Sequence, residues 1–534
     1  MSGGPVGSYD EAVTAARRIV RRGLVFVAGL VVLVVGTPVA LADSPSFGGD
    51  VSVAQTLGDR ELTVVLRRIT SLPGPLRVDV VTHAGTPAGR LAVAAIPFGA
   101  ARNRPDPGVP FARGAIELAA AAGMYSTDLT VDRPGPWELT IDDGSRVARI
   151  PFAVPAQVTS PPERLVYGGF LIAGVLLPIS VLVAVRARRT AWALIPAGGM
   201  VAGVAVAITA ALLSSTLPMP PQPGAQLDPS VENLTDPYDL GQPQQADFSR
   251  PPVMLRVGGE PLTAGRPGEL RLDLTDAATG AAVDDLTIHD SALMHLLVVG
   301  PSGELRHLHP VRIAPGRYEA HLTPSTPGRY ALSAELARRG GGVQSVRAAT
   351  GFTVGGGTAE AVVNPVRLGA NTMTGSIVVE DVPVTVTATA GRAGSPITLS
   401  ARFGDRADLQ PWLGMVGHMI VAGPIGDDSD IGAAVQNSPA WGHAHSMGGA
   451  APMPEGHDMA GMRDMPGMAG HAWGGAMVMP PVNGNSAPDE TVAAYGPDVP
   501  FTYTFPEPGR YRVWIQAERN YTVLTVPIVL EVPR

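Results

Sequence analysis

Short runs in which apolar and polar residues alternate recur along most of the chain. Examples are ELTVVLRRI at 61–69 and ELRLDLTD at 269–276. Because successive side chains of a strand point to opposite faces, this alternation predicts strands with one buried face. Turn signals separate the runs about every 8–12 residues, which is typical of antiparallel sandwiches. We therefore predict a mainly β protein with three immunoglobulin/cupredoxin-like antiparallel β-sandwich domains, at residues 44–156, 250–356 and 379–534.

One strand–turn–strand pattern occurs three times. GMYSTDLTVDRPGPWEL (123–139) aligns without a gap with GRYEAHLTPSTPGRYAL (316–332), and FTYTFPEPGRYRVWIQAE (501–518) repeats the same Pro-Gly-Arg-Tyr turn. A Pro-Gly pair marks a turn, and the alternating residues after it, such as Tyr330 and Leu332, are expected to face a core. The repetition predicts that the three domains are copies of one unit.

The amino-terminal part of the chain has the features of a targeting segment. Four arginines between 17 and 22 precede an apolar run from Leu24 to Val35, and Ala40-Leu41-Ala42 offers a small-residue cleavage site. This pattern predicts a signal peptide at 1–42, with an uncleaved anchor of the same orientation as the alternative.

Two further runs, 165–185 and 191–213, contain no charged residue. At about 1.5 Å per residue each can cross a hydrocarbon core of roughly 30 Å, so they predict a transmembrane hairpin. The arginines in its turn, 186–190, favour the cytoplasmic side. All three β domains are then expected on the extracytoplasmic side of the cell membrane, after a Pro-rich linker at 214–249 for the last two.

Composition excludes several classes of function. The 534 residues include no cysteine, which rules out disulfides, thiolate metal sites and cysteine nucleophiles. The net charge of -8 argues against a nucleic-acid partner. We find no Ser-His-Asp arrangement, phosphate-binding loop or pair of catalytic carboxylates, so we do not expect an enzyme.

The second and third repeats carry matched histidines. Each has an apolar strand that begins with His, then a turn, then an H-x-H motif, as in MHLLVV…HLHP and GHMIVAG…HAH. Residues i and i+2 of a strand share a face, so three imidazoles can converge on one side of a sheet and bind Cu(II) or Zn(II). A single H-x-H motif more often binds nothing, but its repetition favours a metal site. The predicted ligands are His295, His307 and His309 in the second domain and His418, His443 and His445 in the third. The first repeat lacks them, and we interpret its His83 as an ordinary surface residue.

A stretch rich in Met and His, at 446–480, interrupts the third domain and is too poor in large aliphatic residues to form a core. Thioether sulfur is a soft ligand that selects Cu(I), and imidazole adds capacity for Cu(II). The alternative is a low-complexity loop that binds no ligand. The candidate ligands in and beside this stretch are Met447, Met453, His457, Met459, Met462, Met465, Met468 and His471.

The motifs MHLLVV…HLHP…PGRYAL and GHMIVAG…HAH…PGRYRVW resemble those of the YtkA-like and CopC-like groups of extracytoplasmic copper-associated domains. The resemblance covers 250–356 and 379–534, and 44–156 more loosely. It implies cupredoxin-type barrels that bind copper through His and Met. The predicted mature start, Asp43, is not histidine, so the amino-terminal copper site of CopC-like proteins is not expected.

Three functions remain open from the sequence. The leading hypothesis is a membrane-anchored, extracytoplasmic, non-catalytic copper-binding protein for sequestration, delivery or resistance, with another extracytoplasmic copper protein as a candidate partner. The second is an envelope scaffold without metal. The third is a copper-dependent oxidoreductase whose ligands are divided between domains.

Overall fold

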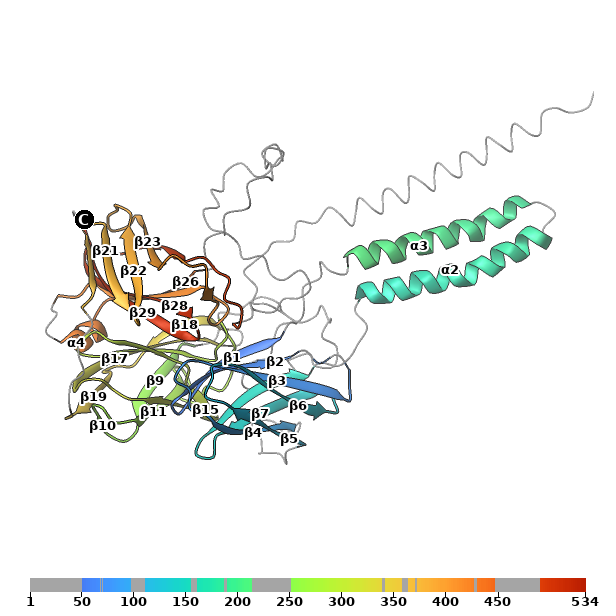
Figure 1. The fold of residues 1–534 in the computed structure, drawn as a ribbon. Coiled ribbons are helices and arrows are strands. Elements are labelled where there is room, and N and C mark those ends of the chain that lie inside the picture. The colour runs from blue at the N-terminus through green and yellow to red at the C-terminus, as the bar shows by residue number, and fades with distance from the viewer. Residues whose placement is uncertain are drawn as a thin grey trace, which may run out of the picture. The chain divides into compact units, whose positions relative to one another are not determined.

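The computed structural model describes residues 50–67, 69, 71–97, 111–154, 161–186, 190–213, 251–338, 341–357, 364–369, 372–426, 430–446 and 490–534. Within these residues the chain is mainly β, with several antiparallel sheets and a pair of apolar helices, as predicted (Figure 1). The predicted signal peptide (1–42) and the linker (214–249) lie outside the described residues.

The first sandwich has two four-stranded antiparallel sheets. One, in the order β1-β2-β3-β6, contains β1 (Val51–Leu57), β2 (Arg60–Leu66), β3 (Gly74–Thr82) and β6 (Gly123–Val131). The other, in the order β5-β4-β7-β8, contains β5 (Ala112–Leu118), β4 (Gly89–Pro97), β7 (Gly135–Asp142) and β8 (Val147–Val154). Their facing apolar residues form one core around the fully buried Trp137.

The second sandwich pairs a larger sheet with a four-stranded one. The larger sheet contains β10 (Leu262–Thr263), β19 (Phe352–Gly355), β17 (Gly328–Arg338), β13 (His295–Val299) and β14 (Leu305–Leu308) in that order, with β12 (Leu286–Thr287) and β18 (Gly342–Arg347) on β17. The smaller sheet contains β15 (Val311–Ala314), β16 (Arg317–Leu322), β11 (Gly268–Asp276) and β9 (Val253–Gly258).

The third sandwich repeats this plan. Its larger sheet contains β20 (Val366–Gly369), β29 (Thr522–Val532), β28 (Gly509–Arg519), β25 (Gly417–Gly423) and β26 (Ala440–Ser446), with β24 (Leu409–Gln410) on β28. Its smaller sheet contains β21 (Thr374–Val379), β22 (Val382–Ala388), β23 (Pro396–Phe403) and β27 (Asp498–Thr504). The helix α4 (Ile431–Gln436) lies between β25 and β26. Because β20 pairs with β29, this sandwich begins before residue 379, and our predicted boundary is corrected accordingly.

The repeated Pro-Gly turn carries the chain from one sheet of a sandwich to the other. The strands before the turn, β6, β16 and β27, belong to one sheet of their sandwich, and the strands after it, β7, β17 and β28, belong to the other. The turn glycines have φ of +132°, +140° and +141°, which explains why glycine stands there in each copy. The aromatic residue two positions later reaches back to a carbonyl four residues upstream. Tyr330 and Tyr511 donate their hydroxyls over 2.8 Å to Thr326 and Glu507, as in a tyrosine corner.

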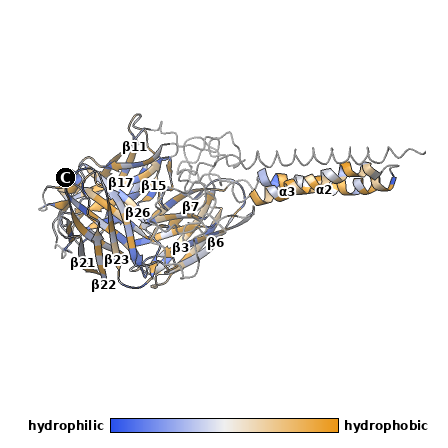
Figure 2. Ribbon diagram, turned by 90° about the horizontal axis from the view of Figure 1, so that it is seen from above, coloured by the Kyte–Doolittle hydropathy of each residue, from blue (hydrophilic) through white to orange (hydrophobic). Residues whose placement is uncertain are grey.

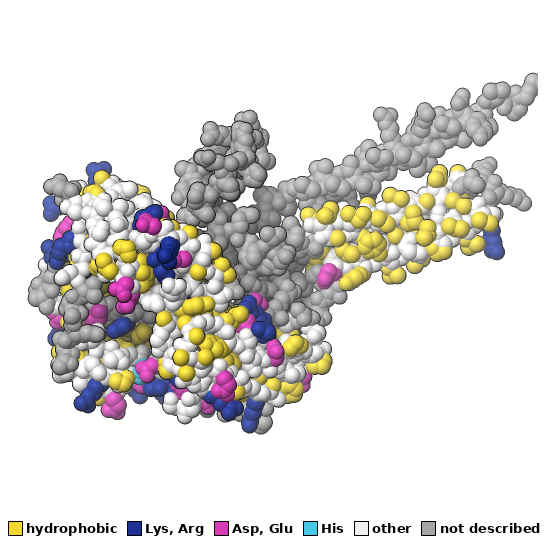
Figure 3. Space-filling view, in the orientation of Figure 1, with side chains coloured by type: hydrophobic (Ala, Val, Ile, Leu, Met, Phe, Trp, Pro, Cys, Tyr) yellow, Lys and Arg dark blue, Asp and Glu magenta, His cyan; other side chains and the backbone are white. Residues whose placement is uncertain are grey.

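The helices α2 (Pro161–Arg186) and α3 (Leu194–Leu213), the latter preceded by a 3-10 turn at Thr190–Ala193, run side by side. Small residues allow this: a side chain at Gly169 would meet the Gly203 carbonyl oxygen at 2.4 Å. Most residues of the pair are hydrophobic (Figure 2), and apolar side chains cover the face of the pair that Figure 3 shows. Both helices are long and apolar enough to cross a membrane. Residues 187–189 of the predicted cytoplasmic turn lie outside the described residues.

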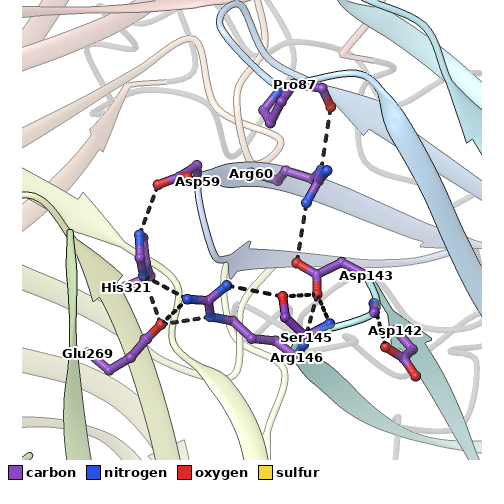
Figure 4. A network of polar contacts seen from close by, with 10 residues as sticks. Asp59, Arg60, Pro87, Asp142, Asp143, Ser145, Arg146, Glu269 and His321 are labelled. Carbon is purple, nitrogen blue, oxygen red and sulfur yellow. Dashed lines mark hydrogen bonds and ion pairs between the residues drawn. The ribbon is translucent and has the colours of Figure 1, made fainter.

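The first and second sandwiches meet through a polar network (Figure 4). His321 of β16 lies 2.8 Å from Asp59 of the first sandwich and 2.8 Å from Glu269 of its own. Arg146 of the first sandwich donates to Glu269 over 2.7 Å. Next to this network, Val311 of β15 completes the core of the first sandwich. The contact thus combines ion pairs at its rim with apolar packing.

The second and third sandwiches share a separate apolar core. It contains Leu297, Val299, Leu305 and Ala331 of the second sandwich and Ile420, Ala422, Ile425, Ile431, Val435 and Trp514 of the third. Every residue of β13 and β25 is buried, because one face of each strand packs in its own sandwich and the other against the neighbour. This explains why HLLVV and HMIVAG are continuously apolar instead of alternating.

Candidate metal centre

Five of the six predicted histidine ligands of the two repeats lie on β13, β14, β25 and β26, on the strand faces that meet at the junction of the second and third sandwiches, and His309 directly follows β14. The positions of these histidines along their strands explain this placement. His295 shares a strand face with Leu297 and Val299, and His418 shares one with Ile420 and Ala422, all of which enter the shared core. The H-x-H motifs follow on the hairpin partners, where His418 stands opposite His445. The same periodicity that buries the apolar residues therefore turns the imidazoles toward the neighbouring sandwich.

In the second sandwich, two imidazoles face each other with unprotonated nitrogens. His295 Nε2 lies 3.1 Å from the His289 carbonyl oxygen, which can only accept, so Nε2 carries the hydrogen and Nδ1 is bare. That Nδ1 lies 3.1 Å from His307 Nε2. His307 Nδ1 in turn donates to Gln516 Oε1 over 3.0 Å, and the amide group of Gln516 is oriented by its donation to Thr525. Both nitrogens between the two rings therefore present lone pairs.

The third sandwich repeats the arrangement. His418 Nε2 lies 3.2 Å from the Trp412 carbonyl oxygen, again six residues upstream, which leaves Nδ1 bare. This Nδ1 is 3.3 Å from His443 Nε2, while His443 Nδ1 faces Glu335 of the second sandwich at 3.5 Å. The two trios are thus arranged in the same way. In each trio, the first histidine of the H-x-H motif faces a polar side chain of the other sandwich.

In the last histidine of each motif, one ring nitrogen lies near a carboxylate and the other has no hydrogen-bond partner among the described residues. His309 Nδ1 lies 2.5 Å from Glu61 of the first sandwich, and His445 Nδ1 lies 3.4 Å from Asp290. The Nε2 atoms of both are buried without a hydrogen-bond partner among the described residues. A carboxylate on Nδ1 fixes the tautomer that leaves Nε2 free, which is the usual support of a metal-binding histidine.

The two trios form one cluster. Ligand atoms of His295, His307 and His309 lie within 4.8 Å of one another, and so do those of His307, His418 and His443. The rings of His307 and His443 are 5.2 Å apart, and Trp412 packs edge-on against three of the imidazoles. His295, His309 and His418 are at most 1% exposed. Donors that the sequence assigns to two separate sites thus lie side by side in one buried volume.

The nitrogen spacing fits a bound ion. Two nitrogens held at roughly 2.0–2.1 Å from one metal with near-tetrahedral angles lie about 3.3 Å apart. The facing nitrogens in the two sandwiches are 3.1 and 3.3 Å apart. Without a proton or a cation between them, lone pairs at this distance repel each other in a site of low dielectric constant.

The electrostatics favour neutral imidazoles. Burial lowers the pKa of His295, His307 and His418 well below the usual value, and the neighbouring imidazoles lower it further. Burial and His443 lower the pKa of His445 to about 4. Neutral imidazole is the form that binds metal ions. Four of the six candidate donors are therefore in the form that can bind a metal ion at neutral pH.

Sequence reasoning missed the carboxylates around the cluster, because they come from other strands and another sandwich. His289, Asp290 and Glu335 lie within ligand-binding distance of one another. Burial alone would lower the pKa of His289, but Asp290 and Glu335 raise it to about 9. Burial would also raise the pKa of Glu335, but His289 and His443 hold it far below the usual range. His289, Asp290 and Glu335 therefore form a group of ion pairs that supports the cluster.

Our interpretation of His83 as a surface residue is wrong. Its side chain is buried, and Nδ1 lies 2.5 Å from Glu518 of the third sandwich. Nearby, Ala84 donates its backbone N–H to Tyr521 over 2.7 Å. The first sandwich therefore contacts the third as well as the second, and it closes one side of the cluster with Glu61 and Thr56, whose hydroxyl accepts from the His309 backbone N–H.

The His83–Glu518 contact predicts a pH-dependent stability. Burial lowers the pKa of His83, but Glu518 outweighs it and raises the pKa from 6.5 to about 9. The contribution is complete below pH 6.5 and is lost as pH rises through 9, and its full size is on the order of 3 kcal/mol. Thermal unfolding of the wild type and of His83→Gln should therefore differ most near pH 6.5 and least above pH 9. A constant difference across this range would contradict the ion pair.

The Met/His-rich stretch lies outside the described residues from 447 onward. The structure therefore does not place Met447, Met453, His457, Met459, Met462, Met465, Met468 or His471, and their role as ligands stays a prediction. The stretch follows directly on β26, which carries His443 and His445 and ends at Ser446. Any ligand in the first few residues after Ser446 is thus close in sequence to His443 and His445.

Comparison with known proteins gives a short family match and a likeness of fold. Residues 484–534 match the family described as "Domain of unknown function (DUF8832)". No curated protein matches the chain significantly. Among solved structures, the chain is similar to a tetra-tandem repeat in the extending region of a large adhesion protein, with 10% identity, coverage of 91% of this chain and 74% of that chain, and a TM-score of 0.14.

Two further solved structures are similar to the chain. One is Salmonella alpha-2-macroglobulin reacted with methylamine, with 10% identity, coverage of 91% and 24%, and a TM-score of 0.16. The other is dimeric latent PorU from Porphyromonas gingivalis, with 8% identity, coverage of 93% and 35%, and a TM-score of 0.17. The chain spans about a quarter and about a third of these two proteins. At such similarity none of the three says anything about what this chain binds.

Proposed function

We propose that the protein is a membrane-anchored copper-binding protein that sequesters or delivers the metal outside the cytoplasm and catalyses no reaction. The observation that carries the proposal is the pair of facing imidazole nitrogens in each trio, 3.1 and 3.3 Å apart, in a buried cluster of six histidines. Such a set of donors is costly to bury unless a cation binds between them.

Several features favour copper over other metals. Six imidazoles suit copper and zinc, and copper(II) binds most tightly among the divalent first-row metals. The Met-rich stretch that follows β26 in the sequence adds soft donors that prefer Cu(I), and the resemblance to YtkA-like and CopC-like domains points the same way. The two apolar helices supply the anchor, and the arginines between them support an extracytoplasmic location for the β domains.

The test is metal analysis of the full chain in detergent after exposure to copper and removal of the excess. The Met-rich stretch must be silenced first, by changing its eight methionines between 447 and 479 to Leu and its two histidines to Gln; we call this the silenced chain. The silenced chain is expected to retain copper. The same chain with His307, His309, His443 and His445 changed to Ala is expected to retain none.

The matched control is His321→Gln, because His321 is a buried histidine bonded to carboxylates outside the cluster. It should retain as much copper as the silenced chain. Equal copper in the silenced chain and in the fourfold variant contradicts the proposal, and retention of zinc in preference to copper contradicts the choice of metal.

The carboxylate behind His309 gives a second prediction. Changing Glu61 to Ala removes the acceptor that holds His309 Nδ1–H, while the histidine itself remains. Loss of such a support typically weakens metal binding about 10–100-fold. Competition with a copper chelator measures the affinity. The control Glu117→Ala, an exposed glutamate of the same sandwich, should leave the affinity unchanged; an equal loss in both variants contradicts the role of Glu61.

A copper-dependent oxidoreductase is the second candidate, because the histidine ligands come from two sandwiches that meet at one cluster. The depth of the cluster argues against it, since His295 and His418 are at most 1% exposed. The non-catalytic proposal predicts no copper-dependent oxygen consumption by the copper-loaded chain in the presence of a reductant, beyond that of the fourfold variant. An oxygen electrode decides between the two.

A further inference from the structure

The histidine cluster contains two donor sets at matching strand positions. In the second sandwich the set is His295 Nδ1, His307 Nε2 and His309 Nε2; in the third it is His418 Nδ1, His443 Nε2 and His445 Nε2. In each set the remaining nitrogen of the first histidine faces a backbone carbonyl six residues upstream. The remaining nitrogens of the H-x-H residues face polar side chains from another part of the chain. The ligand atoms of the second-sandwich set lie within 4.8 Å of one another. In the third-sandwich set, His418 and His443 form such a group with His307, and the ring of His445 lies 4.5 Å from that of His443.

One ion cannot satisfy both sets. The two Nε2 atoms that are buried without a partner, on His309 and His445, belong to different sets. A four-coordinate ion in one set leaves the other set with converging lone pairs and an unpartnered buried nitrogen, which is unfavourable. Two ions, one in each set, give every inward-facing nitrogen a partner.

The charges around the cluster are also compatible with two ions. Glu61 faces the second-sandwich set, whereas Glu335 and Asp290 face the third-sandwich set. Each set thus has at least one carboxylate beside it, which can offset part of the charge of a bound cation.

We propose that the cluster is a dinuclear copper centre, with one ion held by His295, His307 and His309 and the other by His418, His443 and His445. This rests on the copper-binding function proposed above and adds to it the number and position of the ions. The sets are adjacent, since ligand atoms of His307, His418 and His443 lie within 4.8 Å of one another. Three imidazoles leave a fourth position on each ion, so a small anion such as hydroxide can bridge the pair.

The first test is stoichiometry. The silenced chain, loaded with Cu(II) in detergent and desalted, is expected to retain two copper ions per chain. His309→Gln and His445→Gln, each in the silenced chain, are expected to retain one, and His321→Gln two. Glutamine keeps most of the volume of histidine, and far-ultraviolet circular dichroism of the metal-free variants shows whether they fold.

The outcomes separate this proposal from the previous one. A silenced chain that retains no copper overturns both. A silenced chain that retains one ion, with that ion lost in both single variants, overturns the dinuclear centre and leaves the copper-binding function standing. Two ions in the silenced chain and one in each variant support the pair.

The second test reports on the distance between the ions. Electron paramagnetic resonance of the Cu(II)-loaded silenced chain is expected to show far fewer spins than copper ions, because ions that share a bridging ligand couple magnetically. Each single variant is expected to show one isolated Cu(II) signal with a full spin. Two uncoupled spins per chain in the silenced chain overturn the shared bridge.

Discussion

Replacing Trp514 with alanine is expected to lower the free energy of unfolding by about 3–5 kcal/mol, the usual cost of removing a fully buried large aromatic side chain. Trp514 lies on β28 of the third sandwich, is 1% exposed and packs in the core shared with the second sandwich. Its indole N–H donates over 3.0 Å to the Gly303 carbonyl of the second sandwich. The substitution therefore weakens the contact between the second and third sandwiches.

Thermal and denaturant unfolding of the full chain measure this effect. Trp514→Phe keeps most of the apolar contact but loses the bond to Gly303, so it should cost about 1–2 kcal/mol. Val378→Ala, at a side chain that is 64% exposed, serves as the control and should stay within about 0.5 kcal/mol of the wild type. If Trp514→Ala unfolds like the control, the two sandwiches do not pack as described.

The same substitution has a functional consequence. The two histidine sets lie on the same strand faces as the shared core, so a loosened junction moves them apart. We expect Trp514→Ala to weaken copper binding by the cluster while copper uptake by the Met-rich stretch is unchanged. Comparing the full and the silenced chain with and without the substitution separates the two contributions. An unchanged copper affinity of the cluster would show that its sets need no support from this core.

Replacing Arg312 with alanine is expected to destabilise the contact between the first and second sandwiches by about 3–5 kcal/mol, as removal of one partner of a buried ion pair usually does. Arg312 is 1% exposed. It binds Asp284 with two nitrogens, at 2.8 and 2.7 Å, and Glu138 of the first sandwich at 3.1 Å. Without the guanidinium, the carboxylates of Asp284 and Glu138 remain buried with less positive charge nearby to balance theirs.

Two comparisons test the electrostatic cause. A variant with Arg312→Met, Asp284→Leu and Glu138→Leu together should be less destabilised than Arg312→Ala alone. Arg90→Ala breaks an ion pair whose side chains are 69% and 73% exposed, and it should cost about 1 kcal/mol or less. A triple variant that is as destabilised as Arg312→Ala would point to lost packing.

The local structure of the sandwiches could be predicted from the sequence because it depends on residues close together in the chain. Alternation gave strands such as β2 and β23, and the Pro-Gly turn with its aromatic residue recurs where glycine must adopt positive φ. The shared face of His307 and His309 follows from the same two-residue period. These features need no knowledge of the rest of the fold.

The boundary of the third sandwich could not be predicted in this way. Its strand β20 pairs in parallel with β29, which lies at the far end of the chain. Such a contact leaves no clear local signal, since β20 has only four residues, Val-Arg-Leu-Gly, which are too few for a distinctive alternation. Long-range strand pairing is decided only when the sheet assembles.

What the sequence determined by itself is therefore the repeated β unit, the apolar helix pair and the presence of an imidazole trio in each of two repeats, because strand periodicity and helix length are local properties. Only the tertiary structure decided that the trios meet, that Glu61 of the first sandwich supports His309, and that His83 is buried against Glu518. These contacts join residues far apart in the chain. The geometry on which the proposed metal binding depends arises from packing one sandwich against another.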